Sequence, residues 1–229
     1  MSEATDKTIH REFELERMIL FSDAVFAIAI TLLAIEIKFP ELPEHVNAST
    51  DLGKLFKPTF KEFFGFFISF LLIGISWSRH LKMFRYLKAY DDRVVMLNLL
   101  SLLFIVIFPF TASGLAHFKE GFVLPYLIYI GNLTLMFFSN FLLAYYIFKA
   151  KPALSVPEHT AEKTYIYLQN KFVSIAFALA FTIMLITAII THYDYDSVFL
   201  SFCSLFIFMG IARRKLNKYK PKKAVVYGN

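Results

Sequence analysis

One apolar run near the start of the chain restricts the possible folds more than any other feature. Most of residues 17–38 are apolar, and at about 1.5 Å per residue they are long enough to cross a bilayer core of roughly 30 Å. The run nevertheless contains Ser22, Asp23 and Thr31. An ionisable side chain inside a membrane span is costly, so Asp23 indicates a functional or structural site and needs hydrogen-bond donors.

Further apolar runs and the composition agree with a membrane protein. Hydrophobic residues make up 57% of the 229 residues and charged residues 18%, below the charged share of about 25% in soluble domains. The sequence therefore predicts an all-α, multi-pass membrane protein with six transmembrane helices in one repeat. The expected spans are about 17–38, 60–79, 94–116, 122–148, 172–191 and 197–212.

Polar segments divide the chain into three parts and predict its orientation. We expect a polar helical lead-in over residues 1–16, a transmembrane domain over 17–212 and a basic tail over 213–229. Lys and Arg collect in the tail and in the connections after the second and fourth spans. The connection after the fourth span is expected to be a loop over 149–170. Because such residues remain mainly on the cytoplasmic side, both termini are expected to be cytoplasmic, with the tail beside anionic lipid.

Two of the connections between the predicted spans need separate description. The connection after the first span, residues 40–58, is expected to be a surface loop, although it carries lysines that do not fit the charge asymmetry. The connection after the second span is expected to begin at Arg79 and to hold the basic residues Arg79, Lys82, Arg85, Lys88 and Arg93.

The first span separates into two faces on a helical wheel. One side carries the apolar stripe Phe21, Ala24, Ile28, Leu32 and Ile35, with Thr31 at its edge, and the other side carries Phe26, Ile30, Leu33 and Ile37. Asp23 projects toward this second side. Spacing alone leaves the stripe open to two interpretations, namely contact with helices or lipid, or the lining of a pore. Ser22 and Thr31 are expected to donate to the carbonyls of Met18 and Ala27, one turn earlier.

Few polar side chains lie at the depth of Asp23. Trp77 and His80 are three residues apart on the second span and so share a face, while Asn98 lies near the start of the third span. We therefore expect a buried polar network of Ser22, Asp23, Trp77, His80 and Asn98 that determines how the first helix docks. Arg17 lies one to two turns before Asp23 on the same helix.

Several classes of function are not supported. The six histidines are scattered, without ligand spacing or a nucleophile motif, so neither an enzyme nor a metal site is expected. The single cysteine, Cys203, cannot form an internal disulfide. The net charge of +6 is explained by cytoplasmic loops, and nucleic acid is not an expected partner.

The order Arg17-x-x-x-Phe21-Ser22-Asp23, followed by an Ala-Val-Phe-Ala-Ile-Ala-Ile-Thr-Leu-Leu run, resembles the signature of the transmembrane protein 175 family of potassium channels. The Trp77 and His80 pair supports this resemblance more loosely. It implies a prokaryotic member, located in the cell membrane, with one six-helix unit that assembles as a homotetramer.

The resemblance also implies roles for residues of the first helix. This helix would line the pore, with Ile28 as the hydrophobic constriction, Leu32 and Ile35 as further narrow layers, and Thr31 as a threonine layer involved in selectivity. The motif residues would pack against other helices. Potassium would be the permeant ion, and no cofactor is expected.

The sequence contains no Thr-Val-Gly-Tyr-Gly segment, so selection must work without rings of backbone carbonyls. A collar of Ile28 side chains could gate by dewetting. A secondary transporter of small cations or solutes is the alternative, since such proteins use helices broken by Gly or Pro at mid-membrane. The first span contains neither residue, which favours the channel.

Overall fold

The fold is a bundle of long helices. The structure, a computed structural model, describes residues 2–35, 37, 48–117 and 122–221, and their side chains from residue 13 onward except for 48–58 and 61. Within this part of the chain the elements are α1 (Ser2–Ile35), α2 (Ala48–Phe84), α3 (Asp92–His117), α4 (Leu124–Tyr145), the π-helix η1 (Tyr146–Ala150), the 3-10 turn η2 (Pro152–Leu154), α5 (Thr160–Ile190), α6 (Tyr195–Phe202) and α7 (Ser204–Asn217).

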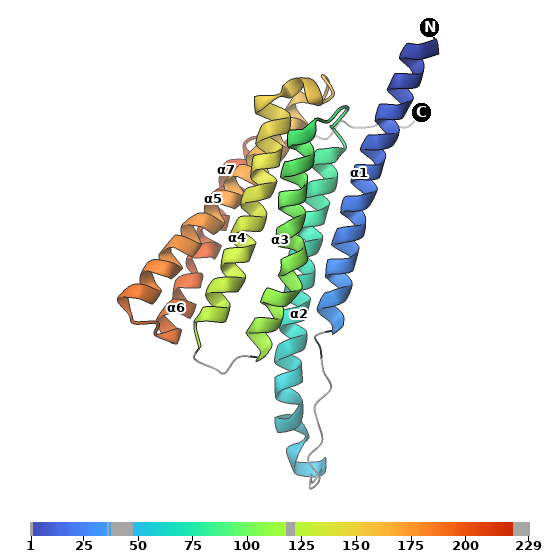
Figure 1. Ribbon diagram of the computed structural model, residues 1–229. Coiled ribbons are helices and arrows are strands. Elements are labelled where there is room, and N and C mark those ends of the chain that lie inside the picture. The colour runs from blue at the N-terminus through green and yellow to red at the C-terminus, as the bar shows by residue number, and fades with distance from the viewer. Residues whose placement is uncertain (1, 36, 38–47, 118–121, 222–229) are drawn as a thin grey trace, which may run out of the picture.

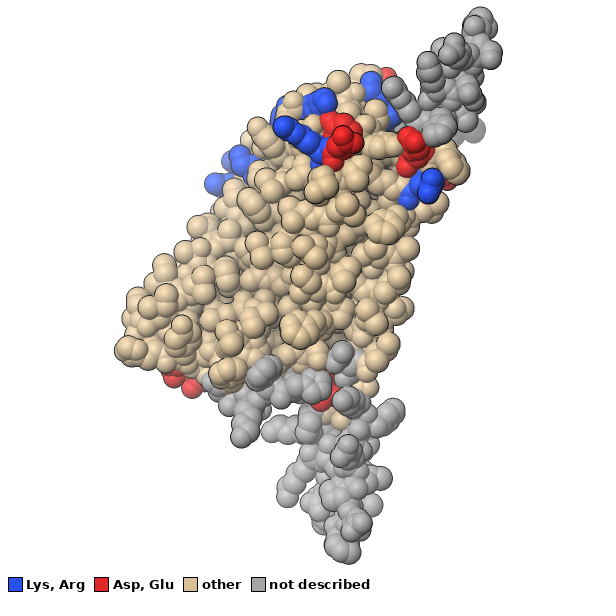
Figure 2. All heavy atoms as spheres, in the orientation of Figure 1, with Lys and Arg blue, Asp and Glu red and all other residues tan. Residues whose placement is uncertain are grey.

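Six segments of the described chain are long and apolar enough to span a membrane, which confirms the all-α, six-span architecture. They are Phe13–Ile35, Glu62–Phe84, Asp92–Leu115, Leu124–Ala150, Thr160–Ile190 and Tyr195–Asn217. The start of α1 and the end of α7 lie at the same end of the bundle, here named the terminal end (Figure 1). On the face in Figure 2, Lys and Arg gather at the terminal end and a broad band without charged residues lies below them.

The helices pack around α4. It lies between α3 and α5, while α1 packs on α3 and α2, and α7 packs on α5. Over the most apolar 18 residues of each span, 67% of the residues of Leu124–Ala150 are buried within the subunit, whereas only 22% of those of Phe13–Ile35 in α1 are buried. The central helices therefore form a scaffold, and α1 presents most of its surface outward.

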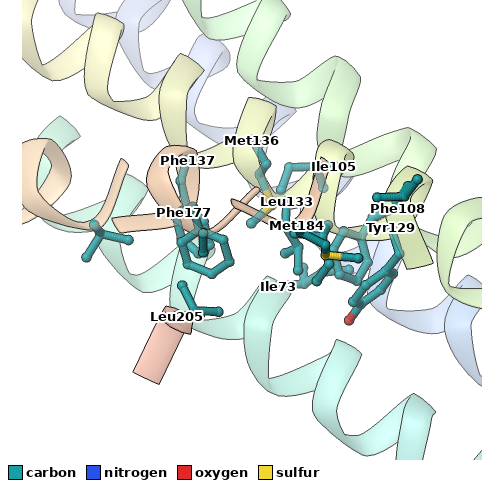
Figure 3. Close-up of a cluster of buried hydrophobic side chains, with 14 of the residues drawn as sticks. Ile73, Ile105, Phe108, Tyr129, Leu133, Met136, Phe137, Phe177, Met184 and Leu205 are labelled. Carbon is teal, nitrogen blue, oxygen red and sulfur yellow. The ribbon is translucent and has the colours of Figure 1, made fainter. Parts of the chain in front are cut away.

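The core lies where α2, α3, α4 and α5 meet (Figure 3). The rings of Phe137 and Phe177 lie 4.6 Å apart between centroids, and those of Phe108 and Tyr129 lie 5.3 Å apart. Tyr129 also hydrogen-bonds Ser69 of α2 at 3.1 Å, which satisfies its buried hydroxyl. In lipid, helix association depends on such close packing and on interhelical hydrogen bonds, because the solvent is itself apolar.

A hydrogen-bonded tie at the terminal end joins the α2–α3 connection to the end of the fourth span. Asp91 caps α3 by accepting from the backbone N–H of Val94 at 3.0 Å. Its other oxygen accepts from the Tyr146 hydroxyl at 2.8 Å and from the Lys151 ammonium at 2.7 Å. Partial burial opposes ionisation of Asp91, but these hydrogen bonds outweigh it and lower the pKa of the carboxyl to about 2.

Three expected boundaries were wrong. The connection expected over 40–58 is helical from Ala48 onward, and Leu52, Leu55 and Phe56 have the spacing of a helix face. Residues 40–47 of that connection lie outside the described residues. The loop expected over 149–170 ends at Thr160, where α5 begins, because Ile166 and Asn170 continue the buried face of α5 beyond the expected span.

The third difference concerns the sixth span, which was expected to be one helix over 197–212. It is interrupted at Cys203 between α6 and α7. The turn tightens there, since Cys203 N–H donates to the carbonyl of Leu200 and Phe206 N–H to that of Cys203. The lead-in over residues 1–16 is part of the same continuous helix as the first span. Residues 222–229 of the basic tail lie outside the described residues.

Gly131 provides a test of the packing between α4 and α5. A Cβ atom at Gly131 would lie 3.2 Å from Cζ of Phe181. We expect Gly131→Leu to overpack this contact and to destabilise the protein by about 1–3 kcal/mol, measured as a lower midpoint of thermal unfolding in detergent. Gly210→Leu is the matched control, because a Cβ there meets nothing within 4 Å. Equal effects of both substitutions would contradict this packing.

The Asp91 tie predicts a pH-dependent contribution to stability. The folded-state pKa is lowered to about 2, so the stabilisation is present above the ordinary Asp pKa of about 3.9 and is lost as the pH falls toward 2. Asp91→Asn should therefore lower the unfolding temperature at pH 7, and the difference from wild type should shrink between about pH 4 and pH 2. Asp92→Asn, at the exposed neighbouring residue, should show no such convergence.

Candidate functional site

The two faces of α1 have opposite environments. Phe26, Ala29 and Leu33 are each 1–2% exposed and pack into the core. The residues of the stripe are uncovered within the subunit, with exposed fractions of 59% for Ile28, 41% for Leu32 and 71% for Ile35. The expected separation of faces is therefore present, and the stripe is a continuous apolar surface free of charged residues.

Thr31 lies beside this stripe and is also exposed. Its hydroxyl donates to the carbonyl of Ile28 at 2.9 Å, so the expected acceptor, the carbonyl of Ala27, was wrong. A threonine hydroxyl on a helix can reach either the third or the fourth preceding carbonyl. Because its proton is used in this bond, the Thr31 oxygen is left as a hydrogen-bond acceptor at the surface.

A buried chain of hydrogen bonds attaches α1 to α2 and α3. Asn98 of α3 donates from Nδ2 to Oγ of Ser22 at 2.9 Å, and its Oδ1 lies 2.8 Å from Nε2 of His80 on α2. Ser22 in turn donates to the carbonyl of Met18 at 2.9 Å, as expected. Because the Asn98 oxygen can only accept, Nε2 of His80 carries the proton in this arrangement.

Aromatic rings enclose His80. Its ring lies 5.4 Å from that of Phe26 on α1 and stacks at 4.2 Å on that of Phe84, one turn later on α2. His80, Asn98 and Ser22 are each no more than 1% exposed. A polar chain buried in apolar surroundings is costly unless every member is bonded, so it restricts the docking of α1 to one position.

A second hydrogen bond joins α1 to the same face of α2. Nε1 of Trp77 donates to Oδ1 of Asp23 at 2.8 Å. Trp77 lies one turn before His80 on α2. The helix α2 therefore holds two consecutive residues of α1: Trp77 bonds Asp23 directly, and His80 is linked to Ser22 through Asn98. The structure thus brings together all five residues of the expected polar network, here named the α1 anchor: Ser22, Asp23, Trp77, His80 and Asn98. The network was expected to be buried, but this holds only for Ser22, His80 and Asn98, whereas Asp23 is half-buried and Trp77 is 38% exposed.

Two other residues of the motif remain outside the anchor. Arg17 is exposed and its guanidinium lies 6.0 Å from the ring of Phe13 on its own helix. Phe21 is 53% exposed and lies at the start of the stripe. Among the described residues, no three His, Cys, Asp or Glu side chains come together in a group that could hold a metal ion.

Sequence reasoning missed a second polar contact of α2. Arg79 was expected in the connection after the second span, but it lies within α2 with its guanidinium 5.4 Å from the ring of Phe137 on α4. One turn earlier, Ser76 accepts from Nδ2 of Asn140 at 3.3 Å. The signal was the pair Ser76 and Arg79, which are three residues apart and so lie on one side of the helix.

Comparison with known proteins relates this arrangement to a family. Residues 17–109, which contain the whole α1 anchor, match the family model described as "Endosomal/lysosomal potassium channel TMEM175". The helices that form the anchor match the TMEM175 family. The resemblance predicted from the Arg17–Ile37 signature is thereby confirmed.

Several curated relatives resemble part of this TMEM175-like chain. A protein named as a potassium channel from Streptomyces collinus is 35% identical over 102 residues, which are 44% of this chain and 48% of the relative. One from Chamaesiphon minutus is 35% identical over 107 residues, which are 46% of this chain and 51% of the relative. The mouse relative, named as an endosomal/lysosomal proton channel, is 25% identical over 120 residues, 50% of this chain and 23% of the relative. The chain spans about half the length of the bacterial relatives it matches.

Two solved structures share the fold over most of the chain. The crystal structure of a lysosomal potassium-selective channel TMEM175 homolog from Chamaesiphon minutus has a TM-score of 0.63 at 24% identity, covering 90% of this chain and 96% of that one. The crystal structure of a single-residue variant of the potassium channel MtTMEM175 has a TM-score of 0.64 at 20% identity, covering 89% and 94%. These relatives are ion channels and not enzymes.

The α1 anchor predicts energetic coupling between Asp23 and Trp77. We expect Asp23→Ala and Trp77→Phe each to destabilise the protein by about 1–3 kcal/mol, because each leaves a partner unsatisfied. The double variant should cost less than the sum of the two, with a coupling energy of about 0.5–3 kcal/mol. Thermal unfolding of the four proteins in detergent measures this, and size-exclusion chromatography reports loss of assembly. Additive effects would contradict the contact.

Proposed function

We propose that this protein is a potassium-selective channel in which four copies arrange their α1 helices around a central pore. One observation carries the proposal: α1 is docked by its anchor on one side and presents an uncovered, uncharged apolar stripe on the other. The printed names of the bacterial relatives support potassium as the ion. The stripe is then the surface that four subunits bring together.

The proposed constriction is a collar of four Ile28 side chains, with Leu32 and Ile35 forming further narrow layers. An apolar collar holds water poorly, so it can close the pore by dewetting without a moving plug. An ion that crosses it must lose part of its hydration shell. That loss costs less for potassium than for the smaller, more strongly hydrated sodium ion, which gives a modest selectivity.

Thr31 is proposed to compensate part of this loss. Its hydroxyl proton is donated to the carbonyl of Ile28, so its oxygen offers a lone pair and no proton to a passing ion. Four such oxygens, about one turn from the collar, could replace water in the hydration shell of a cation. No metal or organic cofactor is proposed, and potassium is only the permeant ion.

The anchor residues have a positioning role in this proposal. Asp23 is engaged by Trp77 and lies away from the stripe, so it would hold α1 in place and would not bind ions in the pore. Arg17 and Phe21 would complete the motif at the start of the span. We further propose a location in the cell membrane of a prokaryote, with both termini cytoplasmic and the basic residues after Arg213 beside anionic lipid.

A liposome flux assay with potassium and sodium gradients tests the proposal. Ile28→Asn replaces the apolar collar with amides that hydrate ions, so the two fluxes should become nearly equal while the oligomer is retained. Ile207→Asn is the matched control, since Ile207 lies on α7 and is 65% exposed, and it should leave selectivity unchanged.

Three results would overturn parts of the proposal. Unchanged selectivity of an intact Ile28→Asn oligomer would contradict the collar. Saturating flux without unitary currents in planar bilayers would favour a secondary transporter. A pH-sensitive dye distinguishes potassium from protons, because flux that dissipates only a pH gradient would contradict potassium as the ion.

A further inference from the structure

An apolar cavity lies at the end of the bundle opposite the terminal end. Its volume is about 290 Å³, close to the lower limit of roughly 300 Å³ for small-molecule sites. It opens between three elements: the half of α2 that is farther from the terminal end, the start of α4, and α6. All three lie at this end of the bundle in Figure 1. Leu33 of α1, Ile68 of α2, Ile130 of α4, Met184 of α5 and Phe199 of α6 are among the residues that line it.

Few polar groups line the cavity, and they differ in charge and in their hydrogen bonding. The hydroxyls of Tyr126 and Tyr195 are bonded to each other at 2.9 Å, and their rings meet edge to face at 5.4 Å. The Tyr129 hydroxyl is bonded to Ser69. Glu62 is the only charged residue among the described residues that line the cavity. It is half-buried and marks the outer end of the α2 span.

One position on the α2 wall of the cavity carries no side chain. Gly65 lines it one turn after Glu62, and a Cβ atom at Gly65 would meet nothing within 4 Å. The gap between α2 and the rest of the bundle is therefore not closed by packing. In a bilayer, a cavity with apolar walls that opens at a membrane-spanning helix is filled more favourably by hydrocarbon than by water.

We propose that this cavity binds one acyl chain of a phospholipid whose headgroup carries an ammonium, with the Glu62 carboxylate holding that ammonium. The apolar walls accept the chain, and the position of Glu62 at the end of the span matches the depth of a headgroup. A half-buried carboxylate attracts a cation and repels an anionic headgroup, so the site selects phosphatidylethanolamine over phosphatidylglycerol. The proposal does not depend on ion conduction.

Native mass spectrometry tests the site. The protein is exchanged into nanodiscs with equal amounts of phosphatidylethanolamine and phosphatidylglycerol, released into detergent and scored for retained lipid per subunit. Wild type should retain phosphatidylethanolamine in preference, by up to about fivefold, the ratio that roughly 1 kcal/mol gives for a partly exposed ion pair. Glu62→Gln should abolish the preference without emptying the cavity.

Filling the cavity provides the second arm. Gly65→Phe should reduce retention of both lipids, because the ring occupies the space of the chain. Gly74→Phe is the matched control on the same helix, since a Cβ there also meets nothing within 4 Å and Gly74 does not line the cavity. Equal retention of the two lipids by wild type, or unchanged retention by a folded Gly65→Phe protein, would overturn the proposal. If Gly65→Phe fails to fold, the headgroup preference and its loss in Glu62→Gln decide alone.

Discussion

The hydrogen-bond chain from His80 through Asn98 to Ser22 is the interaction on which the placement of α1 depends. Apolar contact alone positions a membrane helix weakly, because its side chains pack almost as well against lipid as against protein. A buried donor or acceptor without a partner, in contrast, costs about 1–3 kcal/mol. Residues from three helices therefore align in one chain, and a rotation or shift of α1 would remove Ser22 from Nδ2 of Asn98 and leave that buried donor unsatisfied.

The anchor also explains why one face of α1 can remain uncovered. Only 22% of the most apolar 18 residues of the α1 span are buried within the subunit, so little packing area is available to hold it against the scaffold. Ser22 and Asp23 supply directional bonds close to the terminal end, and the Phe26, Ala29 and Leu33 face supplies packing along the rest of the span. The stripe with Ile28 and Leu32 consequently takes little part in packing within the chain, and in the proposed tetramer it faces the other copies.

Much of this arrangement could be predicted from the sequence because the bilayer imposes simple rules. The length of an apolar run predicts a span, and the helical period predicts which residues share a face, so the six spans and the two faces of α1 were recognisable. The residues of the anchor were also predictable, since Asp23 required donors and Trp77, His80 and Asn98 were the few candidates at its depth. Their pairing was not, because only Trp77 donates to Asp23, whereas Asn98 bonds Ser22 and His80.

Other features depend on contacts between distant segments and could not be derived in this way. The helical start of α5 at Thr160 depends on burial of Ile166 and Asn170 outside the apolar run. The interruption at Cys203 is a local change of hydrogen bonding without Gly or Pro. Arg79 was assigned to a basic connection because hydropathy treats every arginine alike. In the structure its guanidinium instead lies over the ring of Phe137 inside the bundle.

The continuity of α1 has a mechanical consequence. From Ser2 to Ile35 this helix contains neither Gly nor Pro, the residues at which helices most often kink. A hinge in the middle of the helix is therefore not expected. A displacement is expected to move the helix as one rod that turns about its attachment at Ser22 and Asp23. A small tilt at that point is amplified with distance, so Ile35 would travel farther sideways than Ile28.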